Sequence, residues 1–137
     1  MPIAVKTFAS LSEAASAFLA SLTPDQRTKA TFTFDSPDRF DFHFIPRVRK
    51  GLPLRDMTPA QRDKAQALLK TGLSQRGYSA AQTILSLENV LKALEAPNGR
   101  IERNPELYFV SIFGSPAGKD PWGWRWEGHH MAFNFAI

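Results

Sequence analysis

The stretch ELYFVSIFG, Glu106–Gly114, decides the fold expected for this chain. Large apolar side chains fill both alternating sets of its positions, with Leu107, Phe109 and Phe113 in one set and Tyr108, Val110 and Ile112 in the other. Successive side chains of a strand point to opposite faces, so this strand must be buried on both faces. We therefore expect it in the middle of a sheet that is covered on both sides.

The ending PWGWRWEGHHMAFNFAI, Pro121–Ile137, is interpreted as one long strand beside it. Its tryptophans, Trp122, Trp124 and Trp126, share one parity, whereas the large apolar residues from Met131 onward have the other. A β-bulge near Gly128 would return both sets to one face. We therefore expect irregular pairing near Gly128, with Trp126 and Met131 on the same side of the sheet. The tryptophans themselves are more typical of a sheet core than of a sugar-binding platform.

Two phenylalanine-rich stretches predict further strands upstream. TFTFD (31–35) and FDFHFIP (40–46) alternate phenylalanine with other residues, and the turn-forming DSPD (35–38) separates them. Strict alternation of this kind is typical of strands with one buried face.

The helices are predicted from capping signals and apolar stripes. The first spans Ser12–Leu22, and because Glu13 interrupts its apolar positions it does not match a secretory signal. LTPDQR and MTPAQR each place a threonine before a proline, with glutamine two residues after that proline, at Thr23 and Gln26 and at Thr58 and Gln61. This is the pattern of a capping box at a helix start.

Two further helices, Pro59–Arg76 and Ser79–Glu95, are predicted to form an antiparallel hairpin linked at Gly77-Tyr78. The residues expected to be most buried in it are Leu69, Leu73, Ile84, Leu87 and Leu91. The predicted fold class is α+β, with this hairpin and the N-terminal helix packed on a mainly antiparallel sheet. We expect one domain over residues 1–137.

Composition excludes several classes of protein. The chain has 137 residues, no cysteine and a formal net charge of +4. Without cysteine there are no disulfides or thiolate ligands, and no apolar run reaches the roughly 20 residues that span a bilayer. The one tight basic group, Arg47, Arg49 and Lys50, lacks interleaved aromatic residues, so neither nucleic acid nor membrane is expected as a partner. A cytoplasmic location is favoured, and secretion stays open.

The candidate site lies in the same ending, at Glu127, His129 and His130. Imidazole transfers protons near neutral pH and is the commonest metal ligand, and a nearby carboxylate can orient it. The hypothesis is a catalytic site, either acid–base or dependent on a divalent metal ion, that acts on a small-molecule substrate. The alternative is a non-catalytic binding or structural domain in which these histidines are hydrogen-bonded core residues.

Three further residues complete the candidate set. His43 lies on a predicted strand that could pair with the histidine strand, so His43, His129 and His130 are the candidate metal ligands. Trp124 and Arg125 are the candidate binding residues. Arg125 could also pair with Glu127, two residues further along the same face.

Several of these motifs together resemble one bacterial family, the domain of unknown function 3500. The similar segments run in order from about Ala15, through RKGLPLRDMTPAQR and NPELYFVSIFG, to PWGWRWEGHHMAFNF. The resemblance implies that the chain is the N-terminal part of a longer domain, whose missing C-terminal half would be its partner and carry further histidines. We therefore expect Phe133, Phe135 or Ile137 to be unusually exposed, and the chain alone to aggregate or be only marginally stable.

Overall fold

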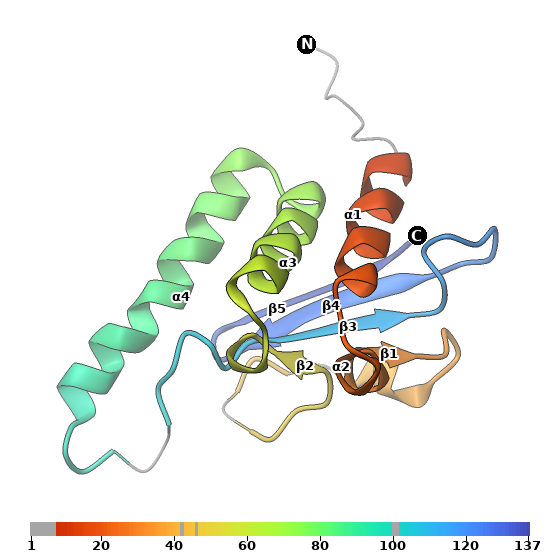
Figure 1. Ribbon diagram of the computed structural model, residues 1–137. Coiled ribbons are helices and arrows are strands. Elements are labelled where there is room, and N and C mark those ends of the chain that lie inside the picture. Colours follow the sequence, from red (N-terminus) through yellow and green to blue (C-terminus); the bar gives the residue numbers. More distant parts are fainter. Residues whose placement is uncertain (1–7, 42, 46, 100–101) are drawn as a thin grey trace.

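A computed structural model describes residues 8–41, 43–45, 47–99 and 102–137 (Figure 1). The elements are α1 (Phe8–Ala20), α2 (Pro24–Ala30), β1 (Thr31–Phe32), η1 (Pro37–Phe40), β2 (Leu52–Pro53), η2 (Leu54–Asp56), α3 (Pro59–Gly72), α4 (Gln75–Glu95), β3 (Phe109–Phe113), β4 (Gly123–Gly128) and β5 (Met131–Ala136). The predicted α+β class is confirmed. No helix in these described ranges is long and apolar enough to cross a membrane.

The sheet is mixed, in the order β1-β3-β4-β5, and β3 lies at its centre as predicted. β4 and β5 continue it as antiparallel neighbours, whereas β1 pairs with β3 in parallel. The short β2 pairs antiparallel with Phe109 and Val110, and β1 pairs with Ile112 and Phe113. The two short strands therefore share one edge of β3, and β4 takes the other.

The ending forms a hairpin, so the prediction of one long strand with a bulge is wrong. Gly128 pairs with Met131, and His129 and His130 make the turn, with His130 at a φ of 64°. Trp126 faces Phe133 across this pair, so the expectation that Trp126 and Met131 share one side is correct. A two-residue turn produces the same change of parity as a bulge. The turn escaped prediction because His-His lacks the glycine or asparagine that usually marks such hairpins.

Helices α1, α3 and α4 lie on the tryptophan side of the sheet (Figure 1). Trp122, Trp124 and Trp126 are buried there, as predicted. A Cβ atom added at Gly72 would lie 2.6 Å from the ring of Trp124, so α3 approaches the sheet closely at this glycine. The Trp124 ring also stacks on Phe135, with 4.5 Å between ring centroids.

The helical hairpin differs in detail from its prediction. α3 ends at Gly72, and α4 begins after Ser74, whose side chain accepts a hydrogen bond from the Gly77 amide. Leu69 is fully buried, but Leu87 is 47% exposed, and the buried residues of α4 are Ala81, Leu85 and Glu88. Leu73, Ile84 and Leu91 are only half-buried. The apolar residues of α4 predicted that the face with Leu87 would be buried. In the structure the buried face of α4 is instead the one that carries Glu88.

Both predicted capping boxes are present and contact each other. Thr23 and Thr58 accept hydrogen bonds from the amides of Gln26 and Gln61, whose side chains in turn accept from the threonine amides. The two glutamine side chains also exchange hydrogen bonds of 2.9 and 2.8 Å, Nε2 to Oε1 in each direction. The starts of α2 and α3 are therefore joined by an amide–amide pair.

The described residues between Thr33 and Gly51 lie on the other side of the sheet (Figure 1), where Asp38 and Asp41 bond Arg125. The strand predicted over 40–46 is wrong for its described residues, since η1 ends at Phe40 and no strand follows before β2. Phe42 lies outside the described residues. The edge of β3 that faces away from β4 is occupied by β1 and β2, so it cannot pair with this segment. Instead, backbone carbonyl oxygens of the segment accept hydrogen bonds from Arg125 and Asn134, two side chains of the sheet.

The apolar end of the chain is better covered than expected. Phe133, Phe135 and Ile137 are half-buried and pack against the core, so the prediction of unusual exposure is wrong. Aggregation of the chain stays a prediction.

Candidate functional site

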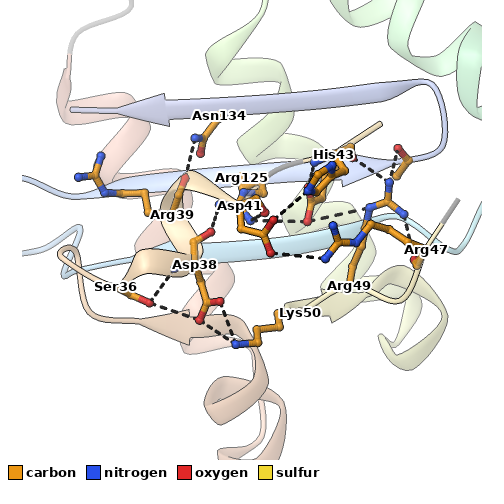
Figure 2. Close-up of polar contacts among 12 residues, drawn as sticks. Ser36, Asp38, Arg39, Asp41, His43, Arg47, Arg49, Lys50, Arg125 and Asn134 are labelled. Atoms are coloured by element: carbon orange, nitrogen blue, oxygen red, sulfur yellow. Dashed lines mark hydrogen bonds and ion pairs between the residues drawn. The ribbon is translucent and has the colours of Figure 1, made fainter. Parts of the chain in front are cut away.

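Arg125 and Glu127 lie on the face of the sheet opposite the tryptophans. Arg125 Nη1 donates to the Asp41 carbonyl oxygen at 2.9 Å, and Arg125 Nη2 donates to the Asp38 carbonyl oxygen (Figure 2). Arg125 Nη1 also lies 3.6 Å from Glu127 Oε1, which matches the pairing expected from their spacing. Burial lowers the pKa of Arg125, and the charge of Glu127 opposes the shift.

Arg49 completes this network from the covering segment (Figure 2). Its Nη2 donates to the carbonyl oxygens of His43 at 2.8 Å and Gly128 at 3.1 Å. Arg49 Nε lies 4.0 Å from Glu127 Oε1, and Glu127 Oε2 accepts the amide of His43 at 3.1 Å. Glu127 is thus committed to two arginines and a backbone amide, and it anchors the covering segment to the sheet.

The structure brings two of the three predicted metal ligands together, His129 and His130, and pairs the third, His43, with Asp41. The His43 ring is held by Asp41, with 2.8 Å between Nε2 and Oδ1, and this hydrogen bond lowers the pKa of Asp41 (Figure 2). His130 is exposed, and its ring lies 3.7 Å from that of His129, measured between centroids. Among the described residues, no group of three or more histidine, aspartate or glutamate side chains is placed to hold a metal ion. The candidate ligands therefore form no such group within the described residues, and metal binding stays a prediction.

His129 has a partner that sequence reasoning missed. Its Nδ1 lies 2.9 Å from Oε1 of Glu88, whose side chain comes from α4 and is buried. Arg103 Nη1 lies 2.7 Å from the same Nδ1 and 3.3 Å from Nε2. A carboxylate can only accept a hydrogen bond, so its contact with Nδ1 requires a proton on Nδ1, and we assign the Nδ1–H to the bond with Glu88. Arg103 can only donate, so in this tautomer its hydrogen bond goes to Nε2 at 3.3 Å. In that tautomer Nε2 keeps its lone pair beside Arg103.

Burial lowers the pKa of His129, while the hydrogen bond and charge of Glu88 oppose the shift. His130 and Arg103 add smaller contributions in the direction of burial, because each places positive charge near the ring. The lowered pKa favours the neutral form of His129, which is the form that can accept a proton.

Tyr108 and Gly128 position the backbone that carries His129. The Tyr108 hydroxyl donates to the His129 carbonyl oxygen, and burial raises the pKa of this tyrosine. A Cβ atom at Gly128 would lie 2.5 Å from the Tyr108 ring, so only glycine leaves room for it there. The turn is thereby held against β3.

His129 opens onto a cavity of about 790 Å³. Its walls come from α2 and β1, from the stretch 47–56, from α4 through Glu88, and from 102–109. Cationic side chains on those walls include Lys29, Arg47, Lys50, Arg55 and Arg103. Trp124 and Arg125, the predicted binding residues, belong to the two packed faces of the sheet and do not line it, and neither do Glu127 and His130.

Of the predicted site residues, only His129 lines this cavity, and Glu88, Arg103 and Tyr108 line it beside His129. A signal for Glu88 was present in the sequence, because it is a carboxylate within the apolar arc of α4 between Leu85 and Leu91. No comparable signal marked Arg103, which follows the helix in an irregular segment.

One family matches the chain. It is described as a protein of unknown function, DUF3500, and the match covers residues 5–137. The chain belongs to this family. The DUF3500 match confirms the resemblance and extends over essentially the whole chain, beginning well before Ala15. No curated protein and no solved structure matches the chain. The expected further half of the DUF3500 domain stays a prediction.

Proposed function

We propose that His129 and Glu88 form an acid–base pair that moves a proton on a small molecule bound in the cavity. The observation that carries this proposal is the burial of Glu88, which is 3% exposed and hydrogen-bonded to a histidine that faces open space. Burying a carboxylate costs free energy unless it is paired, so a buried Glu88 without a functional role would be a burden on stability. Buried titratable groups with perturbed pKa values in a cavity are typical of functional sites.

The proposed chemistry follows from the tautomer. With Nδ1–H donated to Glu88, Nε2 of His129 is the atom that accepts a proton from the bound molecule. The imidazolium formed in this step is stabilised by the Glu88 carboxylate at 2.9 Å, and it returns the proton in the next step. In this proposal Arg103 Nη1, 3.3 Å from Nε2, donates to the oxygen atom on which negative charge develops, while Nε and Nη2 of Arg103 stay bonded to Glu95.

The sequence suggested acid–base chemistry with Glu127 as the carboxylate beside His129. This proposal keeps the acid–base chemistry and assigns Glu88 as that carboxylate. Glu127 is committed to Arg49 and Arg125, whereas Glu88 holds the histidine. We do not propose the metal-dependent form, because the three candidate ligands do not converge within the described residues.

A non-catalytic role is the second candidate, and one observation favours it. Arg103 donates to both carboxylate oxygens of Glu95 at 2.9 Å each, so Glu88, His129, Arg103 and Glu95 form a chain of contacts that ties α4 to the hairpin turn. Such a chain could serve packing alone.

The experiment that separates the two candidates is a fragment screen followed by NMR on protein with labelled histidine. Under the proposal, small polar fragments bind and shift the imidazole signals of His129, and the binding is lost in His129→Gln. The matched control, His130→Gln, removes the neighbouring exposed imidazole and should bind as the unmodified chain does. If fragments leave His129 unperturbed, or bind His129→Gln equally well, the pair is structural and the proposal fails.

A further inference from the structure

We infer that the outer edge of β5 is an interface for a second copy of this chain, with the two β5 strands paired antiparallel across a two-fold axis. This inference concerns the opposite edge of the sheet from β1 and β2 and does not depend on the proposed function.

β5 is an edge strand whose outward backbone groups can be identified. Trp122 and Ile137 exchange both backbone hydrogen bonds, at 3.1 and 2.8 Å. Such doubly bonded pairs alternate along an antiparallel ladder, so Met131, Phe133 and Phe135 also bond inward to β4. The N–H and C=O groups of Ala132, Asn134 and Ala136 therefore point away from β4, toward the open edge. In the described part of the chain, β4 is the one strand that pairs with β5.

Residues 131–137, all of them described, carry none of the charges, prolines or bulges that keep edge strands from pairing. The segment MAFNFAI, 131–137, contains no charged residue and no proline. Its pairing with β4 runs without a bulge from Gly128 opposite Met131 to Gly123 opposite Ala136. Edge strands of monomeric proteins are usually protected by lysine, proline, bulges or a covering element. An unprotected regular edge is a template for another strand.

The segment is complementary to itself, which is why we assign a second copy as the partner. Centring a two-fold axis on Asn134 places Ala132 opposite Ala136 of the second copy, so all three outward residues meet outward residues. The same register sets Phe133 beside Phe135 of the second copy, on the helix side of the sheet. Aromatic pairs across strands stabilise such a ladder, and no like charges oppose each other. Both phenylalanines are half-buried in the single chain, so the partner would complete their burial.

The register gives a sharp test, because Asn134 is exposed and meets itself at the axis. The 137-residue chain should run as a dimer in size exclusion with light scattering. Asn134→Lys and Asn134→Asp should each be monomeric, because residue 134 of one copy then faces the same charge on residue 134 of the other copy. An equimolar mixture of these two variants should restore a dimer, because lysine then faces aspartate.

Two control variants test whether the loss of the dimer is due to charge at the two-fold axis. Asn134 Nδ2 donates to the Arg39 carbonyl oxygen at 3.0 Å, so Asn134→Ser, which loses that bond without adding charge, should stay dimeric (Figure 2). Leu87→Lys places a charge on the exposed apolar side of α4 and should also stay dimeric. Circular dichroism establishes that each variant is folded. A monomeric unmodified chain, an Asn134→Lys dimer, a mixture that stays monomeric, or dissociation by Leu87→Lys would overturn the inference.

Discussion

At the level of single residues, the carboxylate that partners His129 is Glu88 and not the predicted Glu127. The sequence offered Glu127, two positions from His129, but strand alternation ends at the turn that contains His129, and Glu127 lies on the face of the sheet with Arg125 and does not line the cavity. Glu88 lies far away in the chain and still reaches His129 at 2.9 Å. Its hydrogen bond and charge raise the pKa of His129 against the larger effect of burial.

We expect Glu88→Gln to lower the pKa of His129 further, because the substitution removes the group that favours the imidazolium. The measurement is an NMR titration of the His129 ring, with Glu102→Gln, an exposed carboxylate on the cavity wall, as the matched control. An unchanged or raised pKa in Glu88→Gln would contradict the assigned pair.

The same shift sets a pH dependence of stability. Because the folded pKa of His129 lies below its ordinary value of 6.5, the unfolded chain binds more protons than the folded chain between the two values. The free energy of unfolding therefore falls as the pH drops from 6.5 through the folded pKa, and the contribution from His129 is absent in His129→Gln.

At the scale of elements, the notable contact joins two helix starts. Each capping glutamine closes its own box and also bonds the other glutamine, so the orientation of α2 against α3 rests on one amide–amide pair. Gln61 is 6% exposed, and its Nε2 also donates to the Ser21 carbonyl oxygen at 2.8 Å. The pair therefore also fixes the end of α1.

We expect Gln61→Ala to cost about 1–3 kcal/mol of unfolding free energy, because it removes the partly buried hydrogen bonds to the Thr58 amide and the Ser21 carbonyl oxygen. Gln26→Ala should cost about 1 kcal/mol, as the loss of a more exposed cap does. In a double-mutant cycle measured by urea unfolding, the two should couple by at least about 0.5 kcal/mol. Additive effects would mean that the two boxes act independently.

At the level of the whole molecule, the two faces of the sheet are covered through two different kinds of interaction. The tryptophan face is closed by apolar packing of helices, whereas the other face is closed by a segment with little regular structure that buried arginines and Glu127 hold in place (Figures 1 and 2). Phe40 and Phe44 in that segment are 70% and 61% exposed, so apolar burial contributes little there.

We expect Glu127→Gln to release this segment, because it leaves the buried cations Arg49 and Arg125 uncompensated. Breaking a buried ion pair on one side typically costs about 3–5 kcal/mol. Limited trypsin digestion should then cleave faster after Arg47 or Lys50, with Glu106→Gln, a partly exposed carboxylate, as the control. Equal cleavage rates in Glu127→Gln and the unmodified chain would show that apolar contacts suffice.

Features that depend on residues close together in the chain could be predicted from the sequence. The double alternation of Glu106–Gly114 predicted the central strand, the threonine and glutamine spacings predicted both capping boxes, and the parity change placed Trp126 and Met131 on one side. Each rests on interactions within a few positions, so the local pattern contains the information needed.

Contacts between residues of distant segments could not be predicted from the sequence and became visible in the fold. The His-His turn, the inward face of α4 and the irregular cover over 33–51 all depend on contacts between segments far apart in the chain. The pairing of Glu88 with His129 joins positions 41 residues apart, and it exists because α4 crosses the end of the β4–β5 hairpin. No periodicity within either segment specifies that crossing. The location of the site therefore had to come from the fold, although one of its residues was visible in the sequence.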